Sequence, residues 1–143
     1  MERTFVAIKP DGVKRGLIGK IIQRFEEKSY KIVALKMLNV TDDIAKKHYE
    51  EHFGKPFYPG LIKFITSGPI VAMAIEGINV IKGVRHIVGS IRADYSSLSS
   101  MNIIHASDCE ESAKRELNLY FSQDEYCPNY LTMFEIFKSE LDS

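Results

Sequence analysis

Four short segments rich in β-branched and apolar residues alternate along this chain with segments whose apolar residues recur at helical spacing. The segments that we expect to form strands are residues 4–8, 31–40, 70–75 and 102–104. The segments that we expect to form helices are residues 18–25, 42–52, 56–66 and 79–88, followed by a last long helix that begins at Ser107. This alternation predicts a domain in which helical crossovers connect the strands of a sheet.

The order of these segments gives two strand–helix–strand units, written together as βαββαβ. This order is typical of the ferredoxin-like α+β fold. We therefore expect a four-stranded, mainly antiparallel sheet, with the helices packed against one of its faces. Because a domain takes about 150 residues, we expect the 143 residues of the chain to form one domain, residues 1–143.

Turn and capping residues mark two of the segment boundaries. The first strand is followed by Lys9, Pro10, Asp11 and Gly12, and these residue types favour a turn. A residue that precedes proline avoids helical geometry, so Lys9 is expected to be extended. Thr41 is suited to cap the helix that follows it.

The charge balance argues against nucleic acid as a specific partner. Nineteen lysines and arginines balance nineteen aspartates and glutamates, so the formal net charge is zero. Proteins that bind the phosphate backbone of nucleic acids usually carry a basic surplus. Any site for a polyanion must therefore come from the local placement of positive charge.

Cysteine content and hydropathy suggest a protein of the cytoplasm. The two cysteines, Cys109 and Cys127, are too few for a disulfide framework and form no C-x-x-C pair. The longest apolar run, residues 70–75, is far shorter than the roughly 20 residues that span a bilayer. The first residues show no secretory pattern, and no membrane partner is expected.

The end of the fourth expected strand carries the most informative histidine. His105 lies between an apolar strand and Ser107-x-x-Glu110, which matches a helix capping box. Free N–H groups at a helix N-terminus favour an anion, and a neutral imidazole there could attack a phosphorus atom. The alternative interpretation is a hydrogen-bonded histidine at a strand end.

Three basic residues favour the phosphate interpretation. Lys9 follows the first strand, and the first and fourth strands are expected to end on the same side of the sheet. Arg85 lies in the helix of residues 79–88, and Arg92 comes just after that helix. Converging on His105, these side chains would form an electropositive phosphate cradle.

Two other functions remain as alternatives. His48-Tyr49-Glu50-Glu51-His52 matches the H-x-x-E-H pattern of a zinc hydrolase, with His48 and His52 four residues apart on a helix. The chain is short for such an enzyme, and the pattern requires a further ligand. A ferredoxin-like sheet can also bind RNA, although the aromatic signature strand of that class is absent from this sequence.

Several long motifs, in order, resemble the nucleoside diphosphate kinase family. The strongest is Asn-Ile-Ile-His-Ala-Ser-Asp at residues 102–108, which resembles the active-site signature of that family. The other matching segments are residues 2–13, 15–19, 48–49, 56–61, 67–69, 79–82 with Arg85, and 111–113. The resemblance implies transfer of a γ-phosphate from a nucleoside triphosphate to a nucleoside diphosphate, ribo or deoxy, through a phosphohistidine and with Mg²⁺.

The resemblance also implies roles for individual residues. His105 would be the nucleophile, Glu116 would hold its other ring nitrogen, and Ser107 would support that arrangement. The residues that would contact the nucleotide or its phosphates are Lys9, Tyr49, Phe57, Leu61, Arg85, Arg92 and Asn102. No protein side chain is implied as a metal ligand, because Mg²⁺ would be held by the phosphates. The resemblance further implies a homo-oligomer built from dimers, with a hexamer favoured.

The sequence departs from the family pattern in one loop and at the C-terminus. The family has a longer loop between the helix of Arg85 and the Ile-Arg pair, whereas here Ser90 follows Gly89 directly and about ten residues are absent. A phosphate-binding threonine is lost with that loop, Met101 replaces an arginine, and Ala106 replaces a glycine. From Ser122 onward the usual tail is absent. These departures leave open a catalytically impaired, nucleotide-binding relative, and they predict altered selectivity for the sugar or the base.

Overall fold

The structure is a computed structural model, and it describes residues 1–98 and 101–142. Its strands are β1 (Glu2–Ile8), β2 (Lys31–Leu38), β3 (Ile70–Gly77) and β4 (Ile104–Ala106). Its helices are α1 (Pro10–Lys14), α2 (Ile18–Glu27), α3 (Asp42–His48), α4 (Tyr58–Ile65), α5 (Val80–Tyr95), α6 (Glu110–Tyr120) and α7 (Met133–Asp142), with single 3₁₀ turns at Glu50–His52 and Gln123–Glu125.

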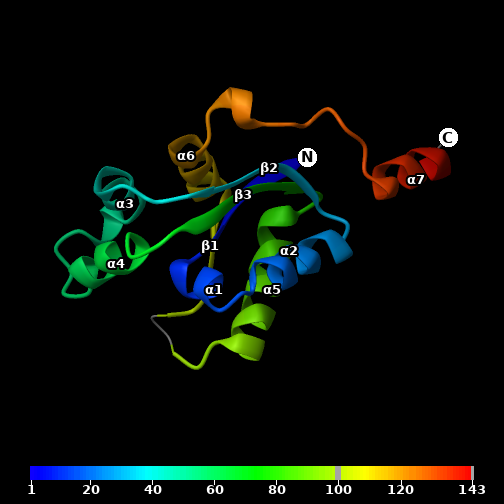
Figure 1. The fold of residues 1–143 in the computed structure, drawn as a ribbon. Coiled ribbons are helices and arrows are strands. Elements are labelled where there is room, and N and C mark those ends of the chain that lie inside the picture. Colours follow the sequence, from blue (N-terminus) through cyan, green and yellow to red (C-terminus); the bar gives the residue numbers. More distant parts are fainter. Residues whose placement is uncertain (99–100, 143) are drawn as a thin grey trace.

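The strands form one antiparallel sheet in the order β2-β3-β1-β4, which confirms the ferredoxin-like α+β prediction (Figure 1). The two central strands pair along their whole length, from Glu2 opposite Gly77 to Ile8 opposite Val71. The short strand β4 pairs with the end of β1, where Ala7 lies opposite His105. This register places His105 beside the buried end of β1.

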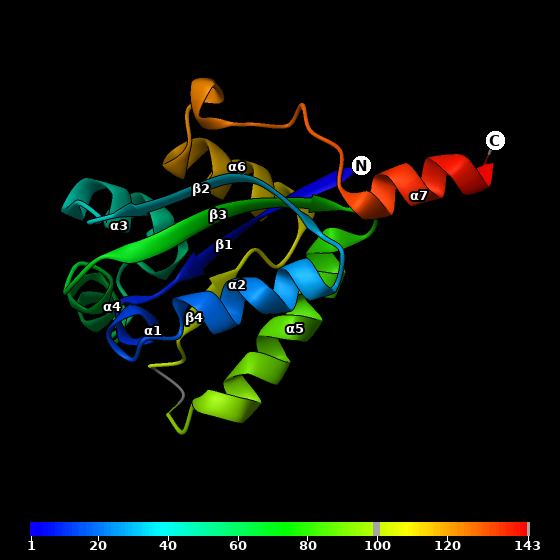
Figure 2. The same cartoon turned by 45° about the vertical axis from the view of Figure 1, so that its right-hand side comes forward.

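Helices cover both faces of the sheet, so the expectation of a single covered face is wrong (Figure 2). Side chains alternate along β1: Val6 and Ile8 pack with α2 and α5, whereas Phe5 and Ala7 pack with α3, α4 and α6. The physical reason is that residues 5–8 of β1 and residues 70–75 of β3 are continuous apolar runs, so both faces of these strands must be kept from water.

The prediction that β1 and β4 end on the same side is also wrong, because the two strands are antiparallel. Lys9, directly after β1, therefore lies beside the start of β4. Its N–H donates to the carbonyl oxygen of Ile103 over 2.7 Å. Because β4 has only three residues, Lys9 nevertheless remains near His105.

The expected turn after β1 includes a short helix, α1, which positions the start of β4. The Asp11 carboxylate accepts a hydrogen bond of 3.0 Å from the N–H of Ile103. Ile103 has a φ of 74°, a left-handed conformation that costs energy for a β-branched residue. Gly12 leaves room for this arrangement, because a Cβ atom there would lie 2.9 Å from the Ile103 side chain. The residues that follow β1 thus fix the backbone that enters β4.

Two helix boundaries differ from the sequence predictions. Helix α5 continues without a break through Gly89 and Ser90 to Tyr95, so Arg92 lies within the helix rather than after it. Helix α6 begins at Glu110, not at Ser107, and its capping box is formed by Cys109 and Ser112. Ser107 does not cap α6, because it lies two residues before the N-cap Cys109 and its hydroxyl donates to Glu116.

The C-terminal segment follows the outer edge of β2 and ends in α7, a helix that the sequence analysis did not identify (Figures 1 and 2). The N–H of Cys127 donates to the Val33 carbonyl over 2.7 Å, and the Tyr130 hydroxyl donates to the Ile32 carbonyl. None of the described helices is both long and apolar enough to cross a lipid bilayer.

Candidate active site

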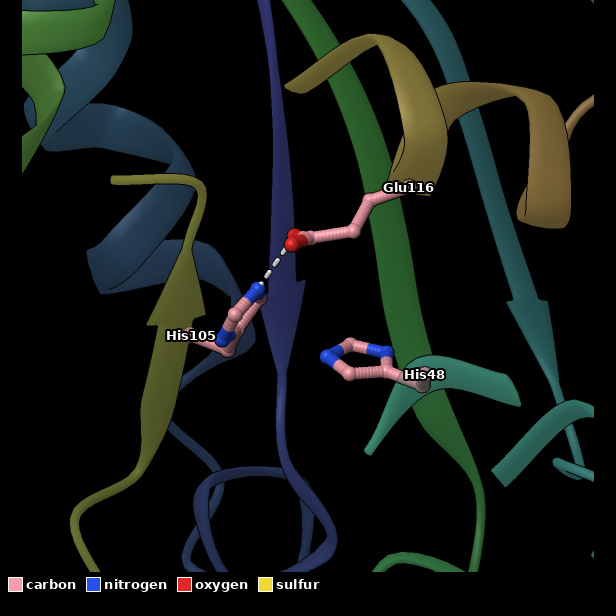
Figure 3. Close-up of side chains that lie close together, drawn as sticks. All are labelled: His48, His105 and Glu116. Carbon is pink, nitrogen blue, oxygen red and sulfur yellow. Dashed lines mark hydrogen bonds and ion pairs between the residues drawn. The ribbon is translucent and has the colours of Figure 1, made fainter. Parts of the chain in front are cut away.

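His105 is held from α6 by a buried carboxylate (Figure 3). Its Nε2 atom lies 2.5 Å from Oε1 of Glu116, and the Ser107 hydroxyl donates to the same oxygen over 3.0 Å. Glu116 and Ser107 are buried, whereas the imidazole of His105 is 23% exposed. The carboxylate is therefore fixed, and the imidazole that it holds is still accessible from solvent.

This contact selects one form of the neutral imidazole. A carboxylate can only accept a hydrogen bond, so Nε2 of His105 carries the ring proton and donates a hydrogen bond to Glu116. The lone pair of the neutral ring then lies on Nδ1, which Figure 3 shows turned away from Glu116. In this arrangement Nδ1 of His105 can act as a nucleophile.

His48 lies beside His105, and the sequence analysis considered it only as a zinc ligand paired with His52. The two imidazole rings are 4.7 Å apart at an angle of 68°. Nδ1 of His48 lies 2.7 Å from the Tyr120 hydroxyl, and burial lowers the pKa of His48 well below 6.5, with the charges of His105 and Arg115 adding to the effect. His48 is therefore neutral at physiological pH.

The helical pair needed for the zinc-hydrolase alternative does not form. Helix α3 ends at His48, and His52 lies in the following 3₁₀ turn, where its ring is 5.4 Å from that of Phe57. One signal for a buried His48 was present in the sequence. It follows Ala45 by three residues on the same helical face, and both residues are buried.

Tyr49 follows His48 and is almost completely buried at the wall of the site. Its ring lies 4.6 Å from that of His48. Burial, with a smaller effect from the charge of Glu116, raises the pKa of Tyr49 to about 12. The Tyr49 hydroxyl therefore keeps its proton at physiological pH and can donate a hydrogen bond.

Lys9 lies at the start of β4 and donates a hydrogen bond of 2.7 Å from Nζ to Oδ1 of Asn102. The Lys9 side chain is buried. Burial, followed by the nearby charge of Arg92, lowers its pKa to about 8, although Asp11 acts in the opposite direction. Lys9 is thus mostly cationic at neutral pH, and its low pKa indicates a place where an anion would be stabilised.

Both arginines of α5 reach β4. Arg85 donates to the carbonyl oxygen of Ala106 over 3.2 Å, and Arg92 donates to that of Ile104 over 2.8 Å. These carbonyls flank His105. Burial, together with the charge of Arg85, lowers the pKa of Arg92. The positive charges that the sequence suggested around His105 do gather there, although Lys9 arrives from the opposite end of β4.

Phe57 and Leu61 form a separate apolar part of the region, at the start of α4. Phe57 is 52% exposed, and the Lys55 ammonium group lies over its ring, 5.7 Å from the ring centroid. Leu61 is half-buried against the core that α4 shares with the sheet. An exposed aromatic face of this kind is available for stacking.

A cavity of about 170 Å³ gives access to His105. His48, Tyr49, Arg85 and Glu116 line it together with His105. The other residues singled out in the sequence do not line this cavity: Lys9, Arg92 and Asn102 lie at or against the start of β4, and Phe57 and Leu61 lie at the beginning of α4. The residues singled out in the sequence are therefore divided between the cavity at His105, the start of β4 and helix α4.

Comparison with known proteins identifies the same family over most of the chain. The family model described as nucleoside diphosphate kinase matches residues 2–126. A nucleoside diphosphate kinase of Rhodopirellula baltica is 49% identical over 98% of this chain and 99% of its own length. One from Thermus thermophilus is 48% identical over 87% of this chain and 98% of its own length.

Solved structures agree with this result. A halophilic nucleoside diphosphate kinase from Halobacterium salinarum in complex with CDP superposes with a TM-score of 0.91 and 41% identity, covering 95% of this chain and 97% of that one. The enzyme from Borrelia burgdorferi, in a transition state mimic with bound vanadate and ADP, gives a TM-score of 0.89 and 35% identity, covering 95% of each chain.

Proposed function

The chain belongs to the nucleoside diphosphate kinase family, and on that premise we propose that His105 carries the phosphoryl group between two nucleotides. The activity is transfer of the terminal phosphate of a nucleoside triphosphate to a nucleoside diphosphate. The observation that supports His105 most directly is its contact with Glu116, which leaves the Nδ1 lone pair free.

In the first half-reaction, Nδ1 of His105 forms a bond to the γ-phosphorus. The bond from that phosphorus to the β–γ bridging oxygen breaks, and the nucleoside diphosphate leaves with the electron pair. The ring becomes cationic, and the carboxylate of Glu116 at Nε2 stabilises it. In the second half-reaction, a terminal oxygen of another diphosphate attacks the phosphorus, and the electron pair returns to Nδ1.

The basic residues around β4 would hold the phosphate chain. Arg85 and Arg92 donate to the carbonyl oxygens on either side of His105, and the Lys9 ammonium group donates to Asn102. Fixed donors of this kind stabilise the charge on the transferred group without reorganising. Asn102 would contact the sugar hydroxyl together with Lys9.

The remaining positions of the nucleotide follow from exposure and burial. Phe57 would stack on the base, because its ring is exposed and every base has a π-face. Leu61, one helical turn later, would extend that apolar contact. Tyr49, buried and protonated, would donate a hydrogen bond beside the transferred phosphate. Ser107 supports the Glu116 carboxylate without touching the substrate.

Phosphoryl transfer between nucleotides generally requires a divalent cation, which we assign to Mg²⁺ held by the nucleotide phosphates. Mg²⁺ prefers oxygen ligands and retains several waters. The site fits this assignment, since the Glu116 carboxylate is already bonded to His105 and Ser107. When bound, Mg²⁺ neutralises charge on the phosphate oxygens, and the side chains described above then position the chain of phosphates.

We further propose that the protein is a cytoplasmic homo-oligomer built from dimers, with a hexamer favoured. Sedimentation or light scattering at micromolar concentration tests this, and a monomer would contradict it.

One experiment distinguishes the proposed kinase from the alternative function, a nucleotide-binding relative that no longer transfers phosphate. On incubation with Mg²⁺ and ATP, the enzyme forms an acid-labile phosphohistidine that ADP discharges, whereas the impaired relative forms none.

A further inference from the structure

One buried polar atom of the site is not used by phosphoryl transfer. Nε2 of His48 has no hydrogen-bond partner among the described residues, although its side chain is only 4% exposed. The other nitrogen of the ring is held by Tyr120. Figure 3 shows the free nitrogen turned toward His105. A buried nitrogen without a partner is costly, so its presence here requires an explanation.

Two further ligand atoms face the same space. One nitrogen of His48, one nitrogen of His105 and one carboxylate oxygen of Glu116 all lie within 4.8 Å of one another. Four-coordinate zinc with ligand bonds of about 2.0–2.2 Å places neighbouring ligand atoms roughly 3.5 Å apart. Zinc would replace the hydrogen bond of 2.5 Å between Nε2 of His105 and the Glu116 carboxylate, and rotation of the three side chains would bring the ligand atoms to such distances.

We propose that His48, His105 and Glu116 form a binding site for Zn²⁺ in the nucleotide-free protein. Two imidazole nitrogens and one carboxylate oxygen form a ligand set that a borderline ion such as Zn²⁺ accepts and that Mg²⁺ does not favour. The open cavity beside His105 leaves room for a water as the fourth ligand. This site therefore differs from the phosphate-held Mg²⁺ in both its ligands and its ion.

Neighbouring side chains outside the ligand set already orient the three proposed ligands. When Nε2 of His48 binds the ion, the Nδ1–H group of His48 donates a hydrogen bond to the Tyr120 hydroxyl. The Ser107 hydroxyl holds the Glu116 carboxylate, and Arg115 lies 3.6 Å from its other oxygen. Such outer partners fix the ring form and orientation of metal ligands. Glu51 and Asp108 also line the cavity and supply negative charge against the surrounding arginines.

Zinc at this site would block the nucleophile. A neutral imidazole has one lone pair, so an ion at Nε2 of His105 moves the ring proton to Nδ1, and an ion at Nδ1 occupies the attacking atom itself. In either case His105 cannot attack phosphorus. The site would make the enzyme sensitive to free Zn²⁺. This inhibitory effect rests on the proposed function, whereas the binding of zinc does not.

Calorimetric titration of the nucleotide-free, full-length protein with ZnCl₂ tests the site. The expected result is one high-affinity Zn²⁺ per chain, with affinity reduced at least about tenfold in both His48→Gln and Glu116→Gln. The matched control is His52→Gln, which changes a histidine of the same cavity that lies outside the cluster and should leave the affinity unchanged. Cys109→Ser/Cys127→Ser removes the exposed thiols and should also leave it unchanged.

Thermal unfolding with and without Zn²⁺ gives a second measurement, in which the wild type and His52→Gln are stabilised and His48→Gln is not. Affinity that is unchanged in both His48→Gln and Glu116→Gln, or lost in His52→Gln or in the cysteine variant, would overturn the proposal. Zinc binding in a protein that forms no phosphoenzyme from Mg²⁺ and ATP would support the metal site and contradict the proposed function.

Discussion

Oε1 of Glu116 accepts hydrogen bonds from both Nε2 of His105, at 2.5 Å, and the hydroxyl of Ser107, at 3.0 Å. One buried oxygen of α6 thus connects the histidine in β4 to the serine that follows this strand. The contact fixes the proton of His105 on Nε2 and leaves Nδ1, the atom that we propose attacks phosphorus, without a proton. In the proposed mechanism it also places a negative charge beside the ring when the ring becomes positive.

Replacing Glu116 should therefore lower kcat more than it raises KM. A hydrogen bond to a charged group contributes about 1.5–3 kcal/mol, so Glu116→Ala should reduce kcat about ten- to hundredfold. Single-turnover formation of the phosphoenzyme measures this loss directly. Ser107→Ala, which removes only the supporting hydroxyl, is the matched control and should show a smaller loss. Equal rates for Glu116→Ala and the wild type would contradict the assigned role.

Asp11 should stabilise the protein through its contact with Ile103. The carboxylate accepts from the Ile103 N–H over 3.0 Å, and Ile103 is fully buried. Asp11→Ala leaves that donor without a partner, which costs about 1–3 kcal/mol of unfolding free energy. Urea unfolding measures the difference. Asp11→Asn keeps an acceptor oxygen and should retain most of the stability, and a loss equal to that of Asp11→Ala would contradict this explanation.

Elements with strong apolar periodicity could be predicted from the sequence. The precise placement of the site residues could not. The four strands and their order follow from apolar runs, and Thr41 caps α3 through the N–H of Ile44 as expected. The short helix α1 was predicted only as a turn, because Gly12 disfavours a helix, whereas Pro10 is also common in the first turn of one. Helix α7 was not identified, although its apolar residues have a helical period.

Long-range contacts explain most of the errors at the site. The direction of β4 relative to β1 is determined by strand pairing. No local sequence signal shows that Lys9 contacts Asn102, before β4, rather than the residues at the end of β4. Ser107 fits a capping box in sequence, but its hydroxyl donates to Glu116, nine residues later, and the helix begins only after Cys109. The pairing of His48 with Tyr120 joins residues 72 positions apart, so a helix-based interpretation of His48 could not include it.

Nucleotide affinity should fall as the pH rises through about 8. Lys9 has a pKa lowered to about 8, so its ammonium group is cationic below that pH and neutral above it. Since we propose that the Lys9 cation holds phosphate, the Kd for ADP should rise on going from about pH 7 to about pH 9.5. Bound phosphate favours the charged form, which places the midpoint in the complex somewhat above that of the free protein. Equilibrium titration with ADP measures this profile.

Two variants separate Lys9 from other titrating groups. Lys9→Met should bind ADP more weakly at neutral pH, and its Kd should no longer depend on pH in this range. Asp11→Asn removes a negative charge that raises the pKa of Lys9, so the fall in affinity should begin at lower pH. An unchanged pH profile in Lys9→Met would show that another group is responsible.

The continuous helix α5 should alter selectivity among nucleotides. Gly89 and Ser90 lie within one uninterrupted helix from Val80 to Tyr95, where the resemblance implies a longer loop in the family. In the family that the sequence resembles, this loop closes over the sugar and phosphates, so its absence should open that side of the pocket and change how the sugar and the base are distinguished. We expect the kcat/KM values for ADP, dADP, CDP and dTDP to differ from one another. Identical values for all four acceptors would contradict this expectation.

The central claim, a phosphoryl group carried on His105, is tested most directly by intact mass after incubation with ATP and Mg²⁺. The wild type should gain the mass of one phosphoryl group, which is labile to acid and is lost when a nucleoside diphosphate is added. His105→Ala should gain none under the same conditions. A wild-type protein that remains unmodified, or a His105→Ala variant that gains the same acid-labile group, would contradict the account.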